Sequence, residues 1–169
     1  MTNSFFKKNQ FYQKKVGIFV PHNDDEMNIA GGLIPILLSQ QADFKIIFLC
    51  NSDYSNRGET RLHESIKALE TLGVHNVLEK ISLLGYPEQH YDEKDHYYMN
   101  HDGTWVSHNG HCTTYNLKGT VSYDWSQSQE HRPLTQESLV KTLCDLCFKE
   151  RFDYYVVIDF DSHCDHRAL

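Results

Sequence analysis

Apolar runs of strand length alternate with segments of helical period along most of the chain. The apolar runs predict buried strands at residues 15–20, 44–50, 77–84 and 153–160. The segments with a helical repeat predict helices at residues 26–40, 57–72 and 135–150. Because strands and helices alternate, the chain is expected to form a mainly parallel sheet with helices on both faces. The fold class is therefore predicted to be α/β, three-layered and Rossmann-like.

Residues 88–133 interrupt this alternation. They are rich in His, Tyr, Asp, Asn, Ser and Gly and lack a helical period, although residues 104–107 and 119–123 could pair as short strands. A loop of this length in a compact domain is usually functional or disordered. It follows the third predicted strand, so we interpret it as a lid or substrate wall, with a mobile insertion as the alternative. Residues 1–14 are predicted to form an N-terminal arm.

Composition and charge restrict the class of protein. A length of 169 residues suits a single domain, residues 1–169, and a net charge of −7 argues against nucleic acid or an anionic membrane as the main partner. No apolar run reaches the roughly 18 residues of a membrane span, and the first residues lack a secretory pattern, so a cytoplasmic location is expected. The five cysteines fit no disulfide framework, and Cys144 and Cys147 lie in a helical pattern that predicts core packing.

Two clusters of histidine and acid follow predicted strands. Pro21-His-Asn-Asp-Asp-Glu26 comes directly after the first strand, and His163-Cys-Asp-His166 comes shortly after the last. Ligands bind at the carboxyl ends of the strands in open α/β sheets, so both clusters are expected at the same edge. One imidazole and two adjacent carboxylates can hold a divalent metal and still leave one carboxylate free as a base.

These clusters resemble the motifs of the LmbE-like, or PIG-L, family of zinc-dependent N-deacetylases. The first is similar to the family's His-Pro-Asp-Asp-Glu signature and the second to its His-Pro-Asp-His motif, with Asn23 and Cys164 in place of the prolines. Arg61-Leu-His-Glu64 resembles the family's Arg-x-x-Glu helix, and Leu84-Gly-Tyr-Pro-Glu88 resembles the turn after its third strand.

The resemblance covers about residues 15–88 and 134–169. Members of the family usually continue beyond the last histidine motif, so the C-terminal part of the family domain is expected to be missing. No helix would then cover the sheet beyond its last strand, and we predict an exposed apolar surface next to residues 154–160. Such a surface would favour a homo-oligomer, poor solubility, or coverage by further residues of a longer chain.

The resemblance implies a zinc site, or a site for another divalent metal, with His22, Asp25 and His166 as ligands. These N and O donors also suit zinc on chemical grounds and leave one position open for water. Asp24 is then free to take a proton from that water. Without the second cluster, His22 and Asp25 could instead cap the following helix, and Asp24 could be a solvated turn acid.

Further residues are assigned roles around that site. His163 is expected to stabilise the oxyanion or to protonate the leaving amine, and Asp165 to orient His163 or tune its pKa. The resemblance makes Arg61 a substrate-contacting residue, and Glu88 could bind sugar hydroxyls. The alternative for Arg61 is a surface ion pair with Glu64.

Several polar residues are given structural interpretations instead. Glu26 is expected to serve the helix dipole, and Asp159 and Asp161 are interpreted as turn acids. The segment His108-Asn-Gly-His-Cys112 has metal-like spacing but lacks an obvious fourth ligand, so it is interpreted as a substrate wall or a plain loop.

The expected function is hydrolytic removal of an N-acetyl group from an N-acetylglucosaminyl-type amino-sugar conjugate, a small-molecule partner. The chain is thus predicted to be a zinc-dependent N-deacetylase. The alternative is a non-catalytic metal- or sugar-binding module, or an inactive truncated member of the family. A nucleotide-binding Rossmann domain is less favoured, because acids follow the first strand where G-x-G-x-x-G would stand, and acids repel a pyrophosphate.

Overall fold

The computed structural model describes residues 9–89, 105–158 and 163–169. Within these ranges its centre is a four-stranded sheet in the order β3-β2-β1-β4, and every pairing in it is parallel. The strands are β1 (Lys15–Val20), β2 (Asp43–Cys50), β3 (Ile81–Tyr86) and β4 (Tyr154–Val156). Helices flank this sheet, so the predicted α/β, Rossmann-like fold class is confirmed.

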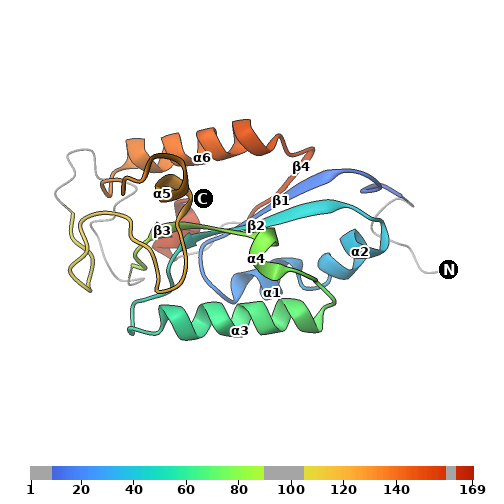
Figure 1. Ribbon diagram of the computed structural model, residues 1–169, viewed down its shortest axis with the longest axis horizontal. Helices are drawn as coiled ribbons and strands as arrows, with labels where there is room; N and C mark the ends of the chain where they lie inside the picture. The colour runs from blue at the N-terminus through green and yellow to red at the C-terminus, as the bar shows by residue number, and fades with distance from the viewer. Residues whose placement is uncertain (1–8, 90–104, 159–162) are drawn as a thin grey trace.

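Helices cover both faces of the sheet (Figure 1). One face carries α1 (Asp25–Ala30), α2 (Ile34–Ser39) and α3 (Gly58–Thr71), and the other carries α5 (Tyr123–Ser128) and α6 (Gln136–Glu150). The short helix α4 (Val77–Lys80) precedes β3, and α7 (Cys164–Arg167) follows β4. None of the helices in the described part of the chain is long and apolar enough to span a membrane.

The side chains of β2 alternate between two apolar cores. Phe44, Ile46 and Phe48 belong to the core shared with α2 and α3, whereas Ile47 and Leu49 belong to the core shared with α6. Successive residues of a strand point to opposite faces, so a strand buried on both faces reads as a continuous apolar run. For this reason β1 and β2 could be placed from the sequence to within one residue.

The helix predicted over residues 26–40 is wrong as a single unit, because Gly31-Gly-Leu33 separates α1 from α2. Two successive glycines weaken a helix. Pro35 lies in the first turn of α2, where its missing N–H costs no hydrogen bond. In a continuous helix its ring would clash with the carbonyl of Gly31.

Two predicted strands have different bounds in the structure. The strand expected at residues 77–84 begins only at Ile81, because residues 77–80 form α4, where Leu78 is largely exposed. The strand expected at residues 153–160 is reduced to β4, and residues 159 and 160 lie outside the described residues.

The pairing predicted between residues 104–107 and 119–123 is wrong for the residues that the structure describes. Residues 105–107 form no strand, and Tyr123 begins α5. An isolated antiparallel bridge between Thr113 and Pro133 closes this segment instead. The remainder of that insertion, residues 90–104, and residues 1–8 of the predicted arm lie outside the described residues.

Apolar side chains are exposed beside β4, as the sequence predicts. Tyr155 is 53% exposed and Val157 is 55% exposed, and both line a shallow cavity of about 170 Å³ together with Leu143 and Cys147. Cys147 is half-buried there, but Cys144 is exposed on α6. The prediction of core packing is therefore wrong for Cys144, which lies on the solvent side of its helix.

Candidate active site

The first histidine–acid cluster lies in the loop between β1 and α1. His22 is buried, its backbone N–H donates to Asp25 Oδ2 at 3.1 Å, and its ring Nδ1 lies 3.2 Å from the same oxygen. Asp24, the N-cap residue of α1, makes no side-chain cap hydrogen bond. The Asp25 carboxylate thus contacts His22, in the loop before the helix, and this arrangement does not support the capping alternative.

The second cluster meets the first at the carboxyl edge of the sheet. His166, on α7, places its Nε2 3.3 Å from His22 Nδ1 and 3.5 Å from Asp25 Oδ2. The ring of His163 packs against the ring of His22 with a centroid distance of 4.6 Å. Residues far apart in the sequence therefore place three donor atoms, two nitrogens and one oxygen, within hydrogen-bond or van der Waals distance of one another.

The three donor atoms suit a divalent metal. Their separations are 3.2, 3.3 and 3.5 Å. Donors bound at about 2.0–2.1 Å in a tetrahedral site lie about 3.3–3.4 Å apart, so little movement would be needed to bring these atoms around zinc. Overlapping donor groups at the same place include His163 with His22 and His166, and Cys50 with His22 and Asp165.

Asp165 holds the ring of His22 from the side opposite the donor cluster. Its Oδ2 lies 3.0 Å from His22 Nε2 and accepts the backbone N–H of Gln89, also at 3.0 Å. The same oxygen is 4.0 Å from His163 Nδ1, the residue that the sequence led us to pair it with. A proton on His22 Nε2 leaves the Nδ1 lone pair facing Asp25 and His166, which is the tautomer that a metal requires.

Burial acts to lower the pKa of His22, but Cys50 and the carboxylates of Asp165 and Asp25 more than offset this effect and raise the pKa well above its usual range. Burial also raises the pKa of the Cys50 thiol to about 12. Because such a thiol is neutral at physiological pH, we attribute the raised pKa of His22 to the two carboxylates. The two carboxylates thus favour positive charge at this imidazole, which a proton or a bound metal cation can supply.

A cavity of about 340 Å³ opens next to Asp24, in the loop that also carries His22 and Asp25, although none of the three donor residues lines it. Its lining residues come from the loop after β1, the loop after β2, α3 and the turn after β3: Asp24, Ser52, Tyr54, Ser55, Arg57, Arg61, Glu64 and Glu88. Arg61 points into it, with Nη2 2.7 Å from Asp24 Oδ2 and Nη1 3.7 Å from Glu88 Oε1. Glu64 instead lies near Arg57, at 3.7 Å, so the predicted alternative of an Arg61–Glu64 surface pair is wrong.

Glu88 connects this cavity with the histidines. Its Oε1 is 3.9 Å from His22 Nε2, and its Oε2 accepts the backbone N–H of Tyr54 at 3.0 Å. Burial raises the pKa of Glu88, although His22 and the Tyr54 N–H act to lower it. Glu88 therefore places a carboxyl group of raised pKa between the cavity and the Nε2 side of the His22 ring.

Asp24 occupies a strained backbone position, with φ 143° and ψ −26°. Such a conformation costs roughly 1–3 kcal/mol and tends to occur at functional sites. The backbone N–H of Asp24 donates to Glu26 Oε2 at 2.9 Å, and Glu26 is fully buried. The interpretation of Glu26 as a residue that interacts with the helix dipole missed this hydrogen bond. No sequence signal distinguishes an acid of that kind from one that accepts a hydrogen bond from the backbone of the preceding turn.

The insertion also reaches the cavity, through contacts that the sequence did not suggest. Asp53, just after β2, accepts from the Tyr115 hydroxyl at 2.6 Å and from the Glu88 N–H at 2.7 Å. His108 stacks on Tyr54 and His111 on Tyr115, and neither belongs to a metal-donor group among the described residues. The substrate-wall interpretation of this segment thus fits better than its metal-like spacing.

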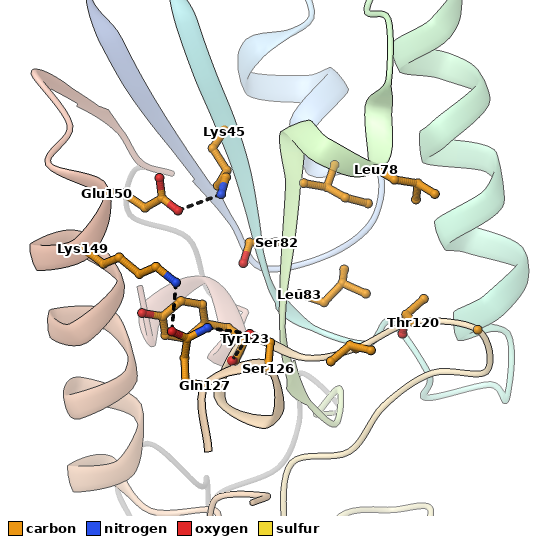
Figure 2. Close-up of a pocket in the computed structure, with 13 residues that line it drawn as sticks. Lys45, Leu78, Ser82, Leu83, Thr120, Tyr123, Ser126, Gln127, Lys149 and Glu150 are labelled. Carbon is orange, nitrogen blue, oxygen red and sulfur yellow. Dashed lines mark hydrogen bonds and ion pairs between the residues drawn. The ribbon is translucent and has the colours of Figure 1, made fainter. Parts of the chain in front are cut away.

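A second cavity, also of about 340 Å³, lies along β3 between α4 and α6 (Figure 2). Its carboxylate, Glu150, is paired with Lys45 at 2.7 Å, and Lys149 donates to Gln127 at 2.9 Å. Among the residues that the structure describes, no histidine or cysteine lines it. The chemistry expected of a metal-dependent site is therefore concentrated at the carboxyl edge of the sheet.

The fold and this site define a Rossmann-like α/β domain with a histidine–carboxylate centre at the carboxyl ends of its strands. A family model described as "PIG-L: GlcNAc-PI de-N-acetylase" matches residues 18–169. The chain belongs to this family, as its motifs indicate. The family indicates deacetylase-type hydrolysis of GlcNAc-like substrates and is metal-dependent in general. A search of curated proteins found no match.

Proposed function

We propose that this protein is a zinc-dependent hydrolase that removes the N-acetyl group from an N-acetylglucosaminyl-type conjugate, a small molecule, in the cytoplasm. The observation that carries the proposal is the convergence of His22 Nδ1, Asp25 Oδ2 and His166 Nε2 within 3.5 Å of one another, next to a cavity of about 340 Å³. Family membership supports the reaction type.

In this proposal His22, Asp25 and His166 hold the metal, and their two nitrogens and one oxygen form a donor set typical of catalytic zinc. A metal bound there would polarise the acetamide carbonyl and lower the pKa of a nearby water. Asp165 fixes the His22 ring so that Nδ1 faces the metal position. Asp165 acts through His22 and is in this respect a positioning residue.

Asp24 is the proposed general base. Its Oδ2 pairs with Arg61 at 2.7 Å, and this contact fixes the direction of the carboxylate beside the cavity. It takes one proton from the attacking water as the C–O bond forms. Arg61 and Glu88, which line the same cavity, contact the sugar.

His163 is the proposed proton donor. Its Nδ1 accepts the backbone N–H of Asp165 at 3.2 Å, so a neutral ring carries its proton on Nε2. That N–H can donate a hydrogen bond to the developing oxyanion. To protonate the leaving nitrogen, the ring must carry a second proton, and it returns to the neutral form when that proton is transferred. Cleavage of the C–N bond then releases acetate and the free amine.

The test is acetate release from an N-acetylglucosamine conjugate by metal-depleted and zinc-restored protein. Asp24→Asn should retain zinc but lower turnover by about 10²–10⁴, the usual worth of a general base. Asp25→Asn should lose zinc as well. Asp43→Asn is the matched control, because Asp43 is similarly exposed and pairs with Lys80 at 2.8 Å away from the site. Zinc binding without acetate release from the native protein would favour a non-catalytic binding module instead.

A further inference from the structure

A histidine of the insertion stacks on an aromatic residue that lines the cavity. The rings of Tyr54 and His108 have a centroid distance of 4.6 Å and an interplanar angle of 28°. Tyr54 lines the cavity beside Arg61 and Glu88, and its backbone N–H donates to Glu88 Oε2 at 3.0 Å. The same Glu88 side chain approaches His22 Nε2 to 3.9 Å. Tyr54 is therefore fixed close to the candidate metal site.

The backbone beside Tyr54 is held by the same insertion. Asn109 Nδ2 donates to the carbonyl oxygen of Asp53 at 2.6 Å, and the Tyr115 hydroxyl donates to Asp53 Oδ2 at 2.6 Å. Asp53 is itself buried, and its other carboxylate oxygen accepts the N–H of Glu88 at 2.7 Å. One carboxylate thus links the insertion, the loop after β2 and the turn after β3.

The turn that carries His108 is well defined by its own hydrogen bonds. The N–H of Gly110 donates to the carbonyl of Ser107 at 2.9 Å, and the N–H of His111 donates to Ser107 Oγ at 3.0 Å. Gly110 adopts φ +82°, a conformation that favours glycine. His108 is consequently presented from a tight turn, which can support the tyrosine ring in one orientation.

We propose that Tyr54, supported by His108, is a specificity-determining residue that packs against the ring of the sugar substrate. This inference rests on the proposed function, because it concerns the sugar whose acetamide reaches the metal site. Pyranose rings present C–H groups on their faces, and an aromatic ring offers them a large, stiff apolar surface. Arg61 and Glu88 bind hydroxyl groups at the ring edge, so aromatic and polar contacts together distinguish a sugar from other acetamides.

The experiment measures kcat and KM for an N-acetylglucosamine conjugate and for N-acetylethanolamine, an acetamide without a sugar ring. Tyr54→Ala should raise KM for the sugar by about 3- to 10-fold, the worth of one aromatic contact, with little change in kcat. Tyr54→Phe should behave like the native protein. His108→Ala and Asn109→Ala should raise the same KM by smaller factors.

His131→Ala is the matched control, because His131 stacks on Trp125 at 4.5 Å in the same insertion but lines neither the cavity nor the donor cluster. It should leave both substrates unaffected. An unchanged sugar KM in Tyr54→Ala, or an equal loss for the sugar and for the ring-free acetamide, would overturn the proposal. Thermal melts of each variant separate these results from misfolding.

A calorimetric titration with glucosamine keeps this inference distinct from the proposed reaction. If no form of the protein releases acetate, the proposed function fails. Weaker glucosamine binding by Tyr54→Ala than by the native protein or Tyr54→Phe would then still support the sugar contact. Equal binding by all three proteins would refute it.

Discussion

Replacing Asp165 with asparagine tests how the chain prepares His22 for a metal. The substitution keeps the size of the side chain but removes its charge from a fully buried position. Two hydrogen bonds of 3.0 Å, from His22 Nε2 and from the Gln89 N–H, converge on one oxygen of this carboxylate. An amide accepts more weakly and cannot stabilise the imidazole as a carboxylate does.

The expected magnitude follows from the role of such partners in metal sites. Loss of a carboxylate that orients a histidine ligand typically weakens metal binding by about 10–100-fold, or about 1.4–2.7 kcal/mol. The donor atoms on His22, Asp25 and His166 remain in place, so the loss should not be total. A variant that bound no zinc would mean that Asp165 is itself a ligand.

Zinc titration in competition with a chromophoric chelator measures this loss. Asp145→Asn serves as the control, because Asp145 is exposed and pairs with Lys141 at 2.7 Å on α6, outside the site. Circular dichroism melts show whether each variant folds. Equal zinc affinities for Asp165→Asn and the native protein would refute the reasoning, because they would show that the 3.0 Å contact with His22 does not influence the donor nitrogen.

Three further outcomes are expected. Partial burial acts to raise the pKa of Glu150, but hydrogen bonds from Lys15 and Lys45 lower this pKa below its ordinary value of 4.5. The charged Glu150 side chain therefore stabilises the fold above pH 4.5, and this stabilisation is lost as the pH falls through the folded-state pKa. Urea unfolding should therefore show that Glu150→Gln is destabilised at pH 7 and that this loss of stability shrinks as the pH is lowered below 4.5. A loss that does not depend on pH would contradict this. Leu69→Ala should lower the free energy of unfolding by about 2–5 kcal/mol, because Leu69 is fully buried. A smaller loss in the same assay would mean that neighbouring side chains fill the cavity that the substitution creates. If the exposed surface beside β4 mediates self-association, light scattering should detect less of it in Val157→Lys than in the native protein. Equal scattering by the two proteins would contradict this role.

The sequence was most informative where burial imposes a simple pattern. β1 and β2 are buried on both faces, so their continuous apolar runs marked them closely. The two histidine–acid clusters could likewise be placed at one edge, because the carboxyl ends of parallel strands share it. The break between α1 and α2 was also present in the sequence, as two glycines followed by Pro35, but the apolar period of the segment obscured it.

Contacts between distant segments could not be predicted in the same way. Sequence spacing suggested that Asp165 would serve His163, its near neighbour, yet its Oδ2 lies 1.0 Å closer to a ring nitrogen of His22, a residue from the other end of the chain. The link between Asp53 and Tyr115 is similarly non-local. Spacing along the chain limits which residues can meet, but only the packing of α7 and the insertion determines which atoms do.

β4, the shortest strand of the described sheet, has a consequence for amide hydrogen exchange. It pairs with β1 through three residue pairs, and His166 follows it on α7. If a metal joins His166 to His22 and Asp25, opening of this edge must first release the metal. At a metal concentration 100 times Kd, this linkage adds about 2.7 kcal/mol to the opening free energy and slows exchange by about 100-fold. The amide hydrogens of β4 would then report metal occupancy without any substrate.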